Sequence, residues 1–438
     1  MELPADVRDA LNAAWRRDVA EKSIERWLGL CESEGWGRIP EDMALLVRIF
    51  GASWYFTRFI FVNGPDMVRL VDEDSPADLS TQAWLEVFRE VYSIEGLESR
   101  VDRLRVLKNR IMLQILIAYL RQDCSMEQTE YALTCLAEAT MQVVTRLFLL
   151  APDDTDHPVT VLGMGRMAGH EMTFGSDLDV IFLYAGESSD MDVELERRIR
   201  LLLRHIAMQT PAGSLYDMDM RLRPHGNAGV LVTTFRSFMD YHGADREIWE
   251  RQLMTRCRPV ANLTDEVHTL MEDVNSHIFG KYDIDILKSG IADMRQRVEK
   301  ELGRPTGKYE VKRGRGGIMD IDFITHYFQL AYGHEQRGLR TGSTRAVLRL
   351  IDESGLLADN TGGRLLDSYD FLKRVEMSLR LFDMKPISTF PFDEEANISL
   401  ARAMGFGESG SRAFVDHYRT VTDDVRDIFN SIMNAESV

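Results

Sequence analysis

The chain has 438 residues, of which 45% are hydrophobic and 9% aromatic. This length exceeds one ordinary core and predicts two or three packed units, and the composition excludes a disordered or fibrous protein. With 52 basic against 70 acidic residues the formal net charge is -18, which disfavours a nucleic-acid partner unless a local basic patch overrides the field.

The cysteines and the apolar segments exclude further classes. The four cysteines are scattered, with no CxxC pair and no neighbouring histidine at zinc-ligand spacing. The first residues lack the apolar centre of a secretory signal, and no apolar run approaches the length that spans a bilayer. We therefore expect a cytoplasmic protein with no membrane partner.

The first part of the chain reads as helical. From residue 1 to about 150 apolar residues recur at helical spacing, as at Leu104, Leu107 and Ile111. The turn-rich stretch Ala151–Pro158 then ends the helices and opens a β-branched run, so it marks the first domain boundary.

Strand-like segments dominate the next part, to about Leu263. They are Val159–Leu162, Leu178–Tyr184, Leu215–Leu222 and Val230–Thr233, with a helix expected over Val193–Met208. Beyond Asp265 helical periodicity resumes and continues to the end of the chain. The pattern predicts a mostly helical α+β protein with a helical region at 1–150, an α/β core at 151–265 and a C-terminal helical domain at 266–438.

A glycine-rich connection joins the first two predicted strands, and two interpretations compete for it. Gly163, Gly165 and Gly169 follow a strand as in a dinucleotide-binding fingerprint. Such a fold would then need an apolar helix, whereas the chain continues with polar, turn-forming residues through Gly175 and Ser176. A dehydrogenase is therefore the weaker alternative.

The second interpretation starts from Asp177 and Asp179. Residues two apart on a strand share a face, so these carboxylates converge while Leu178 points to the core. Hard oxygen ligands favour Mg²⁺ or Mn²⁺, which complete their shells with substrate phosphates. Gly175 and Ser176 would let backbone amides and a hydroxyl approach such a phosphate.

A third acid is available in the alternating run Tyr216–Arg223. One face of the strand expected there carries two carboxylates and two guanidiniums, those of Asp217, Asp219, Arg221 and Arg223. Taken alone, this run also suits an ordinary half-exposed strand with salt-bridged charges. Together with the upstream aspartates it predicts a metal site that accepts a nucleoside triphosphate.

These motifs resemble those of a known family. The glycine turn, Asp177, Asp179 and Asp219 look like the core of the DNA polymerase β-type nucleotidyltransferases. More narrowly, four segments resemble the glutamine synthetase adenylyltransferase family: Gly163–Met172, Asp219–Gly229, Trp249–Glu250 and Gly316–Ile324. The likeness runs from about Ile49 to the end of the chain.

The resemblance implies an activity and its partners. Members of this family commonly carry two such units, one that attaches AMP to a tyrosine of glutamine synthetase and one that removes it by phosphorolysis. This chain holds one unit, closer in its motifs to the attaching half. The resemblance thus implies AMP transfer from ATP in the regulation of nitrogen assimilation, with PII signalling protein as a further partner. The alternatives are the removing unit, a silent regulatory binding module, and a nucleotidyltransferase with another target.

The expected site follows from these residues. Two Mg²⁺ ions would be held by Asp177, Asp179 and Asp219, which are also the catalytic candidates. The ATP-binding candidates are Gly165, Gly175, Ser176, Arg221 and Arg223. Lys312, Arg313 and Arg315 form a dense basic patch that suits phosphate, an acidic protein face or simply a solvated loop.

Overall fold

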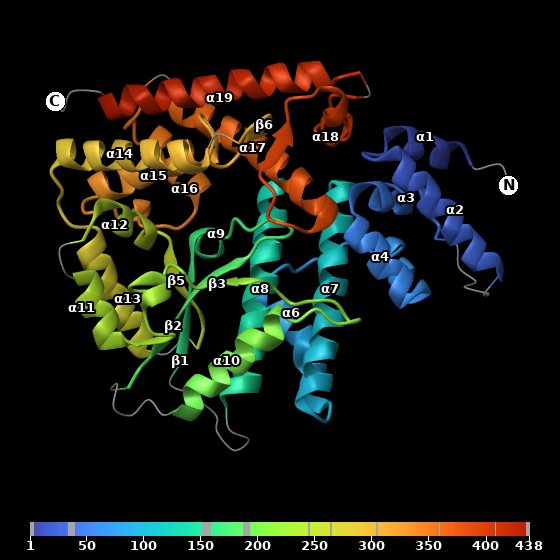
Figure 1. Ribbon diagram of the computed structural model, residues 1–438, viewed down its shortest axis with the longest axis horizontal. Coiled ribbons are helices and arrows are strands. Elements are labelled where there is room, and N and C mark those ends of the chain that lie inside the picture. Colours follow the sequence, from blue (N-terminus) through green and yellow to red (C-terminus); the bar gives the residue numbers. More distant parts are fainter. Residues whose placement is uncertain are drawn as a thin grey trace.

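The computed structural model describes residues 4–33, 40–150, 159–186, 193–243, 246–262, 265–303, 305–358, 360–407 and 409–434. Helices make up most of this structure, and one small sheet lies near its centre (Figure 1). The predicted mostly helical α+β fold is confirmed. The expected boundary at Ala151–Pro158 lies outside the described residues.

The central sheet has five strands. They are β1 (Val159–Met164), β2 (Leu178–Tyr184), β3 (Met218–Asp219), β4 (Val232–Thr234) and β5 (Cys257–Ala261). The order is β3-β2-β1-β5, with β1 antiparallel to both neighbours. Both β3 and β4 pair with β2 in parallel, β3 at its start and β4 at its end. The start of β2 therefore lies beside β3.

Helices cover the sheet from both ends of the sequence. The N-terminal helices are α1 (Ala5–Ala13), α2 (Arg17–Ser33), α3 (Met43–Ala52), α4 (Trp54–Asn63), α5 (Pro65–Val68), α6 (Thr81–Phe88), α7 (Leu97–Arg121) and α8 (Met126–Leu149). Between the strands lie α9 (Gly165–Ala168), α10 (Val193–Ala207), α11 (Phe235–Gly243) and α12 (Ile248–Met254). The C-terminal elements are α13 (Asp265–Ile278), α14 (Ile284–Leu302), α15 (Ile318–Tyr332), α16 (Thr344–Glu353), α17 (Thr361–Asp383), α18 (Ile398–Ala403) and α19 (Ser411–Asn434), with a second, two-stranded antiparallel sheet of β6 (Lys308–Glu310) and β7 (Thr389–Pro391).

The long helix α8 is a core helix. Ser125 caps its start: the Ser125 hydroxyl accepts from the Gln128 N–H at 3.1 Å, and the Gln128 side chain accepts from the Ser125 N–H at 2.8 Å. By length and composition α8 passes the test for a membrane span, contrary to our expectation that no run would. Yet 83% of its most apolar window is buried inside the protein. Its apolarity is thus accounted for by packing.

Alternation along β2 divides the interior into two cores. Leu178, Val180 and Phe182 face a core built mainly from the N-terminal helices, whereas Ile181 and Leu183 face a core built from the C-terminal helices. This is the period of two that a strand buried on both faces requires. Asp179 belongs to the second set by the same alternation, so its carboxylate points towards the C-terminal side.

Two strand predictions need correction. The strand expected over Leu215–Leu222 is confined to Met218–Asp219, because the Asp219 side chain accepts the Arg221 N–H at 2.9 Å and the chain then turns. Strand β5 was missed in the sequence because Arg258 and Pro259 disguise it. Its pairing with β1 supplies the strand character that its own residues lack.

The proposed division at 150 and 265 stays a prediction. Helix α17 contributes Leu365 and Leu372 to the C-terminal core and Met377 and Leu381 to the N-terminal core. The last part of the chain thus reaches back to the first, where α17 contacts α3 and α4, and Figure 1 shows α17 above the sheet.

Candidate active site

Two adjacent strands bring the three predicted acids together. Asp177 lies directly before β2, Asp179 lies on it, and Asp219 lies on β3. The parallel register sets Asp179 opposite Asp219, and the Leu178 N–H fixes this register by donating to the Asp217 carbonyl at 2.9 Å. Asp177 and Asp179 share a face because they are two residues apart.

The acidity of Asp179 reflects this convergence. Burial, then the charge of Asp177 and the smaller effect of Asp219, raise the pKa of Asp179 to about 7, against a lowering effect of Lys312. Carboxylates that share a site resist ionising together unless a cation lies among them. The three aspartates are therefore suited to hold a positive charge.

Arg221 occupies that position in this structure. Its Nε donates to both carboxylate oxygens of Asp219, at 2.9 and 2.8 Å, and this hydrogen bonding lowers the pKa of Asp219. The Arg221 side chain is 71% exposed, whereas that of Asp219 is only 14% exposed. The guanidinium is therefore bound to Asp219 by hydrogen bonds and otherwise largely open to solvent.

Arg223, the other predicted phosphate ligand, stabilises its own loop. Its Nη1 donates to the Met220 carbonyl at 2.7 Å, and Nε and Nη2 lie 3.4 Å from the Gly229 carbonyl. Of the two arginines, Arg221 is the one whose guanidinium lies at the carboxylates.

Gly165 passes close to the acidic cluster. It has a φ of +54° at the start of α9, and a Cβ at this position would lie 3.2 Å from Asp179 Oδ2. A side chain would therefore crowd the carboxylate in a left-handed backbone conformation that favours glycine. Gly165 thus lies beside the acidic cluster, and its role in ATP binding stays a prediction.

The turn at Gly175 and Ser176 is held by the C-terminal part of the chain. A Cβ on Gly175 would lie 2.7 Å from the backbone carbon of Met384. Ser176 Oγ accepts from the Thr173 N–H at 3.0 Å, and Arg380 Nη1 donates to both hydroxyls, at 3.1 Å to Thr173 and 3.2 Å to Ser176. The Ser176 hydroxyl thus orders the turn that leads into Asp177.

A buried ionic network lies behind the glycine turn, and sequence reasoning missed it. Glu171 accepts from the Thr344 N–H at 2.6 Å and from the Tyr369 hydroxyl at 2.7 Å. Arg166 joins Glu171 at 3.0 Å to Asp322 at 2.7 Å, and Arg256 contacts Asp322 at 2.8 Å. Although burial alone would raise them, these arginines lower the pKa values of both carboxyl groups.

Two further cations, Lys373 and Arg380, contribute to the same network. Glu376 accepts from Lys373 at 2.9 Å and from Arg380 at 2.8 Å, so it fixes the guanidinium that grips Ser176. The partners of this network are far apart in sequence, which is why no local pattern announced them. A local signal was the spacing of Lys373, Glu376 and Arg380, which recur three and four residues apart and so share one face of α17.

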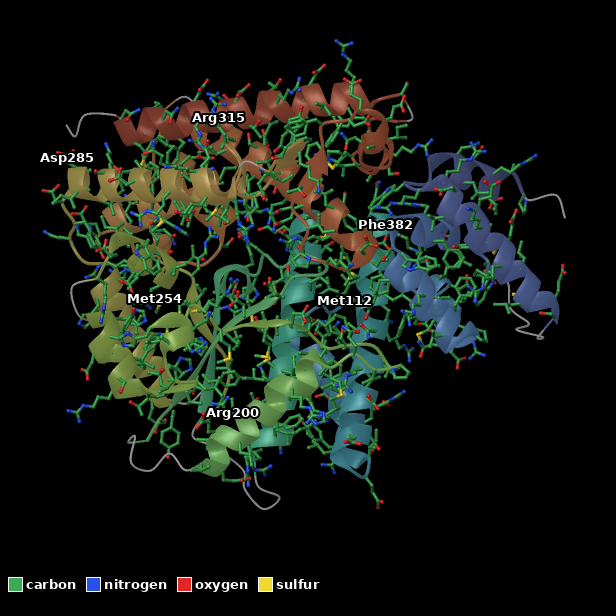
Figure 2. All side chains as sticks on the ribbon, in the orientation of Figure 1. Met112, Arg200, Met254, Asp285, Arg315 and Phe382 are labelled. Carbon is green, nitrogen blue, oxygen red and sulfur yellow. The ribbon has the colours of Figure 1, made fainter. Side chains whose placement is uncertain are left out.

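The predicted basic patch does not act as a unit. Lys312 is close enough to Asp179 to influence its pKa, and burial lowers the pKa of Lys312 itself. Arg315 instead points to α19, where it pairs with Asp423. Figure 2 shows Arg315 beside that helix, at the edge of the molecule. Of Lys312 and Arg315, Lys312 is the one that lies near the three aspartates.

The carboxylates suit a hard cation but do not form a finished coordination shell. Among the described residues, no group of three or more His, Cys, Asp or Glu side chains is arranged to hold a metal ion. The reason is visible at Asp219, whose carboxylate faces Arg221. A cavity of about 460 Å³ opens here, lined by Asp177, Asp219, Arg221 and Asn227 among others.

Three carboxylates converge beside a glycine turn, on two adjacent strands of a small mixed sheet, and this arrangement suits metal-assisted phosphoryl transfer. The family model described as glutamate-ammonia ligase adenylyltransferase matches residues 43–273, more than half of the chain. The chain belongs to this family. A second model, described as GlnD PII-uridylyltransferase, matches residues 287–433.

Two curated relatives carry the same printed name, bifunctional glutamine synthetase adenylyltransferase/adenylyl-removing enzyme. The protein of Thioalkalivibrio sulfidiphilus is 29% identical over 451 residues, which cover 97% of this chain and 46% of the relative. That of Aromatoleum aromaticum is 29% identical over 335 residues, which cover 72% of this chain and 35% of the relative. The chain thus spans about half the length of the first of these relatives.

Proposed function

We propose that this chain moves AMP from ATP to a tyrosine of glutamine synthetase and so regulates nitrogen assimilation. The observation that carries the proposal is the convergence of Asp177, Asp179 and Asp219 on β2 and β3 in a member of this family. A silent regulatory module would have no chemical need for three such carboxylates.

The AMP-removing reaction is the second candidate. The relatives' printed names join attachment and removal in one protein, and this chain matches only part of each. Either direction breaks or makes a bond at the same phosphorus atom, so the three acids would keep their roles. The direction is therefore a separate question from the location of the site.

We further propose that two Mg²⁺ ions, or Mn²⁺ in their place, are held by Asp177, Asp179 and Asp219. Oxygen donors alone fit such hard cations. When bound, the ions would neutralise phosphate charge and polarise the reacting phosphoryl group. Arg221 would have to leave Asp219, and its exposure makes that rearrangement inexpensive.

The chain's own groups supply the remaining steps. A tyrosine phenol, with an ordinary pKa near 10, is protonated at neutral pH, and either contact with a metal ion or Asp219 acting as base would assist the loss of its proton. The released Arg221 guanidinium matches the oxygens of the departing pyrophosphate. Gly165 allows the triphosphate to pass close to Asp179, and the Arg380 contacts keep Ser176 and the following aspartates in position.

The partners extend beyond the substrate enzyme. We propose contact with PII signalling protein through the C-terminal helices, on the strength of the family model matched at 287–433. A cytoplasmic location stays a prediction.

The test is incubation of the purified chain with glutamine synthetase, labelled ATP and Mg²⁺. The Asp177→Asn/Asp179→Asn double variant removes two carboxylates with little change of shape, and Asp240→Asn on the exposed side of α11 is the matched control. We expect label on glutamine synthetase with wild type and control, and none with the double variant.

The direction is decided with the same preparations. A folded wild-type chain that transfers no label would refute attachment. The same chain is then given adenylylated glutamine synthetase and phosphate, where release of ADP would establish removal. Silence in both reactions, with folding verified by circular dichroism, would leave the regulatory module as the surviving interpretation.

A further inference from the structure

A second and larger cavity adjoins the acidic site. It has a volume of about 900 Å³ and lies between α4, α7, the loop from Gln209 to Asp217 and the segment that follows α17. Ser176 and Asp217 line it, and Asp217 also lines the cavity at the three aspartates. Figure 2 labels Met112, which lines this second cavity from α7. The two cavities therefore adjoin at Asp217.

Lys108 is the unusual residue in this cavity. Its side chain is buried, with 3% of the residue exposed, and Nζ donates to Asn109 Oδ1 at 3.2 Å. Within the described ranges no carboxylate forms an ion pair with it, and burial, with no opposing acid, lowers the pKa of Lys108 to about 7. A buried amine without a counter-ion is costly, so its retention points to a charge that arrives from outside.

A second polar group in the same place lacks a partner. Lys108 Nζ lies 4.6 Å from the ring centroid of Tyr216, another residue that lines the cavity. The Tyr216 hydroxyl is buried, and among the described residues it has no hydrogen-bond partner. Two buried polar side chains are therefore incompletely satisfied side by side.

The rest of the lining is mixed: Arg58, Lys385, Asp217 and Asp383 bring charges of both signs, and apolar side chains lie between them. Phe59, Met112, Leu133 and Met172 form the walls, and Trp54 is 49% exposed while lining the cavity. An occupant that suits the cavity thus combines a compact anionic group for Lys108 with an apolar neighbour for these walls.

We propose that this cavity is the docking site for the acceptor polypeptide, and that Lys108 binds an acidic side chain near the modified residue. The inference rests on the proposed function. ATP suits the cavity less well, because its charged part belongs at the three aspartates and its base is uncharged, which would leave Lys108 without a counter-ion. An acceptor brings only a neutral hydroxyl to the aspartates and can carry its carboxylate elsewhere. Its location beside Ser176 and Asp217 lets one chain segment reach both places.

The test compares full-length variants in two measurements. The first is direct binding of glutamine synthetase to the immobilised chain without nucleotide, and the second is the KM for glutamine synthetase and for ATP in the transfer reaction. Lys108→Met removes the charge at nearly constant volume, and Tyr216→Phe removes only the hydroxyl. Lys288→Met on α14 is the control, because Lys288 is also buried and lies 5.7 Å from the ring centroid of Tyr327.

We expect Lys108→Met to weaken acceptor binding and raise the acceptor KM about tenfold or more, the effect of removing one partner of a buried charged contact. Tyr216→Phe should act in the same direction but less, and the KM for ATP should stay unchanged in both variants. The Lys288 variant should match wild type.

Two results would overturn the proposal. A higher KM for ATP with unchanged acceptor binding would assign the cavity to the nucleotide, and no change in either would make Lys108 structural only. If wild type binds glutamine synthetase but neither adds nor removes AMP, the proposed function fails while the binding comparison still decides the role of the cavity. A wild-type chain that shows no binding refutes this acceptor and its docking site together.

Discussion

Replacing Lys108 with methionine should stabilise the protein. Burial lowers the pKa of Lys108 to about 7 from the ordinary 10.5 that the unfolded chain retains. Below pH 7 the folded state therefore holds a charge that it disfavours by about 5 kcal/mol, since one pKa unit corresponds to about 1.4 kcal/mol. Loss of the hydrogen bond to Asn109 offsets about 1 kcal/mol. A net gain of about 4 kcal/mol is expected at pH 6.

This gain should shrink as the pH rises. Between pH 7 and 10.5 the unfolded chain binds a proton at Lys108 that the folded chain has released, so the stability contributed by this group increases with pH in the wild type. The methionine variant has no such dependence. Its advantage should fall from about 4 kcal/mol at pH 6 to about 1 kcal/mol at pH 9.

The assay is urea unfolding followed by tryptophan fluorescence at both pH values. Met112→Leu is the control, because it alters the same cavity without a titratable group, and its effect should be equal at pH 6 and pH 9. A Lys108→Met variant that is less stable than wild type at pH 6, or whose advantage does not change with pH, would refute the reasoning.

Three further perturbations test other parts of the structure. Gly316→Ala should prevent stable folding, because φ is +67° and the new Cβ would lie 1.7 Å from a backbone oxygen of α19; Gly355→Ala, with φ +68° and open space around it, should cost only about 1 kcal/mol in thermal unfolding. Asp322→Asn removes the carboxylate that pairs with two buried arginines, Arg166 and Arg256, and should lower the free energy of unfolding by about 3–5 kcal/mol at pH 7. The difference in unfolding free energy between this variant and wild type should decrease below about pH 4 in acid-unfolding curves. The pKa of Asp322 is lowered in the folded state, so the wild-type carboxylate loses its stabilising charge there. Arg380→Met frees Ser176 and should lower kcat about tenfold or more in the transfer assay while the circular dichroism spectrum is retained; an unchanged kcat would show that the turn holds its shape unaided.

The parts of the fold that local patterns determine could be predicted from the sequence. Strand β2 alternates between two buried faces and follows a glycine turn, and α10 has a clear helical period, so both were found close to their observed bounds. Strand β3 was predicted too long, because alternation in residues 220–222 continues past the point where Asp219 binds the Arg221 backbone. The side-chain hydrogen bond, which ends the strand, has no signature in hydrophobic periodicity.

In the candidate site, too, local sequence predicted some features, and others depend on how distant segments pack. The convergence of Asp177 and Asp179 follows from two residues on one strand, whereas the nearness of Asp219 depends on a parallel register that no local pattern specifies. Arg380 lies 204 residues beyond Ser176, and its role became visible only once α17 was placed against the sheet. Lys108 was hidden for another reason: in sequence it is one more cation on an amphipathic helix, and its burial is a property of the packed molecule.

Helix α17 connects the C-terminal core to the turn that precedes Asp177. It is one continuous helix of 23 residues, so its two ends move together. Its first half packs among the C-terminal helices. Its last turns carry Arg380, which donates a hydrogen bond to Ser176, the residue directly before Asp177. The C-terminal core and the turn that precedes Asp177 are thereby joined by a single helix, so the placement of the acidic cluster depends on how the C-terminal helices pack.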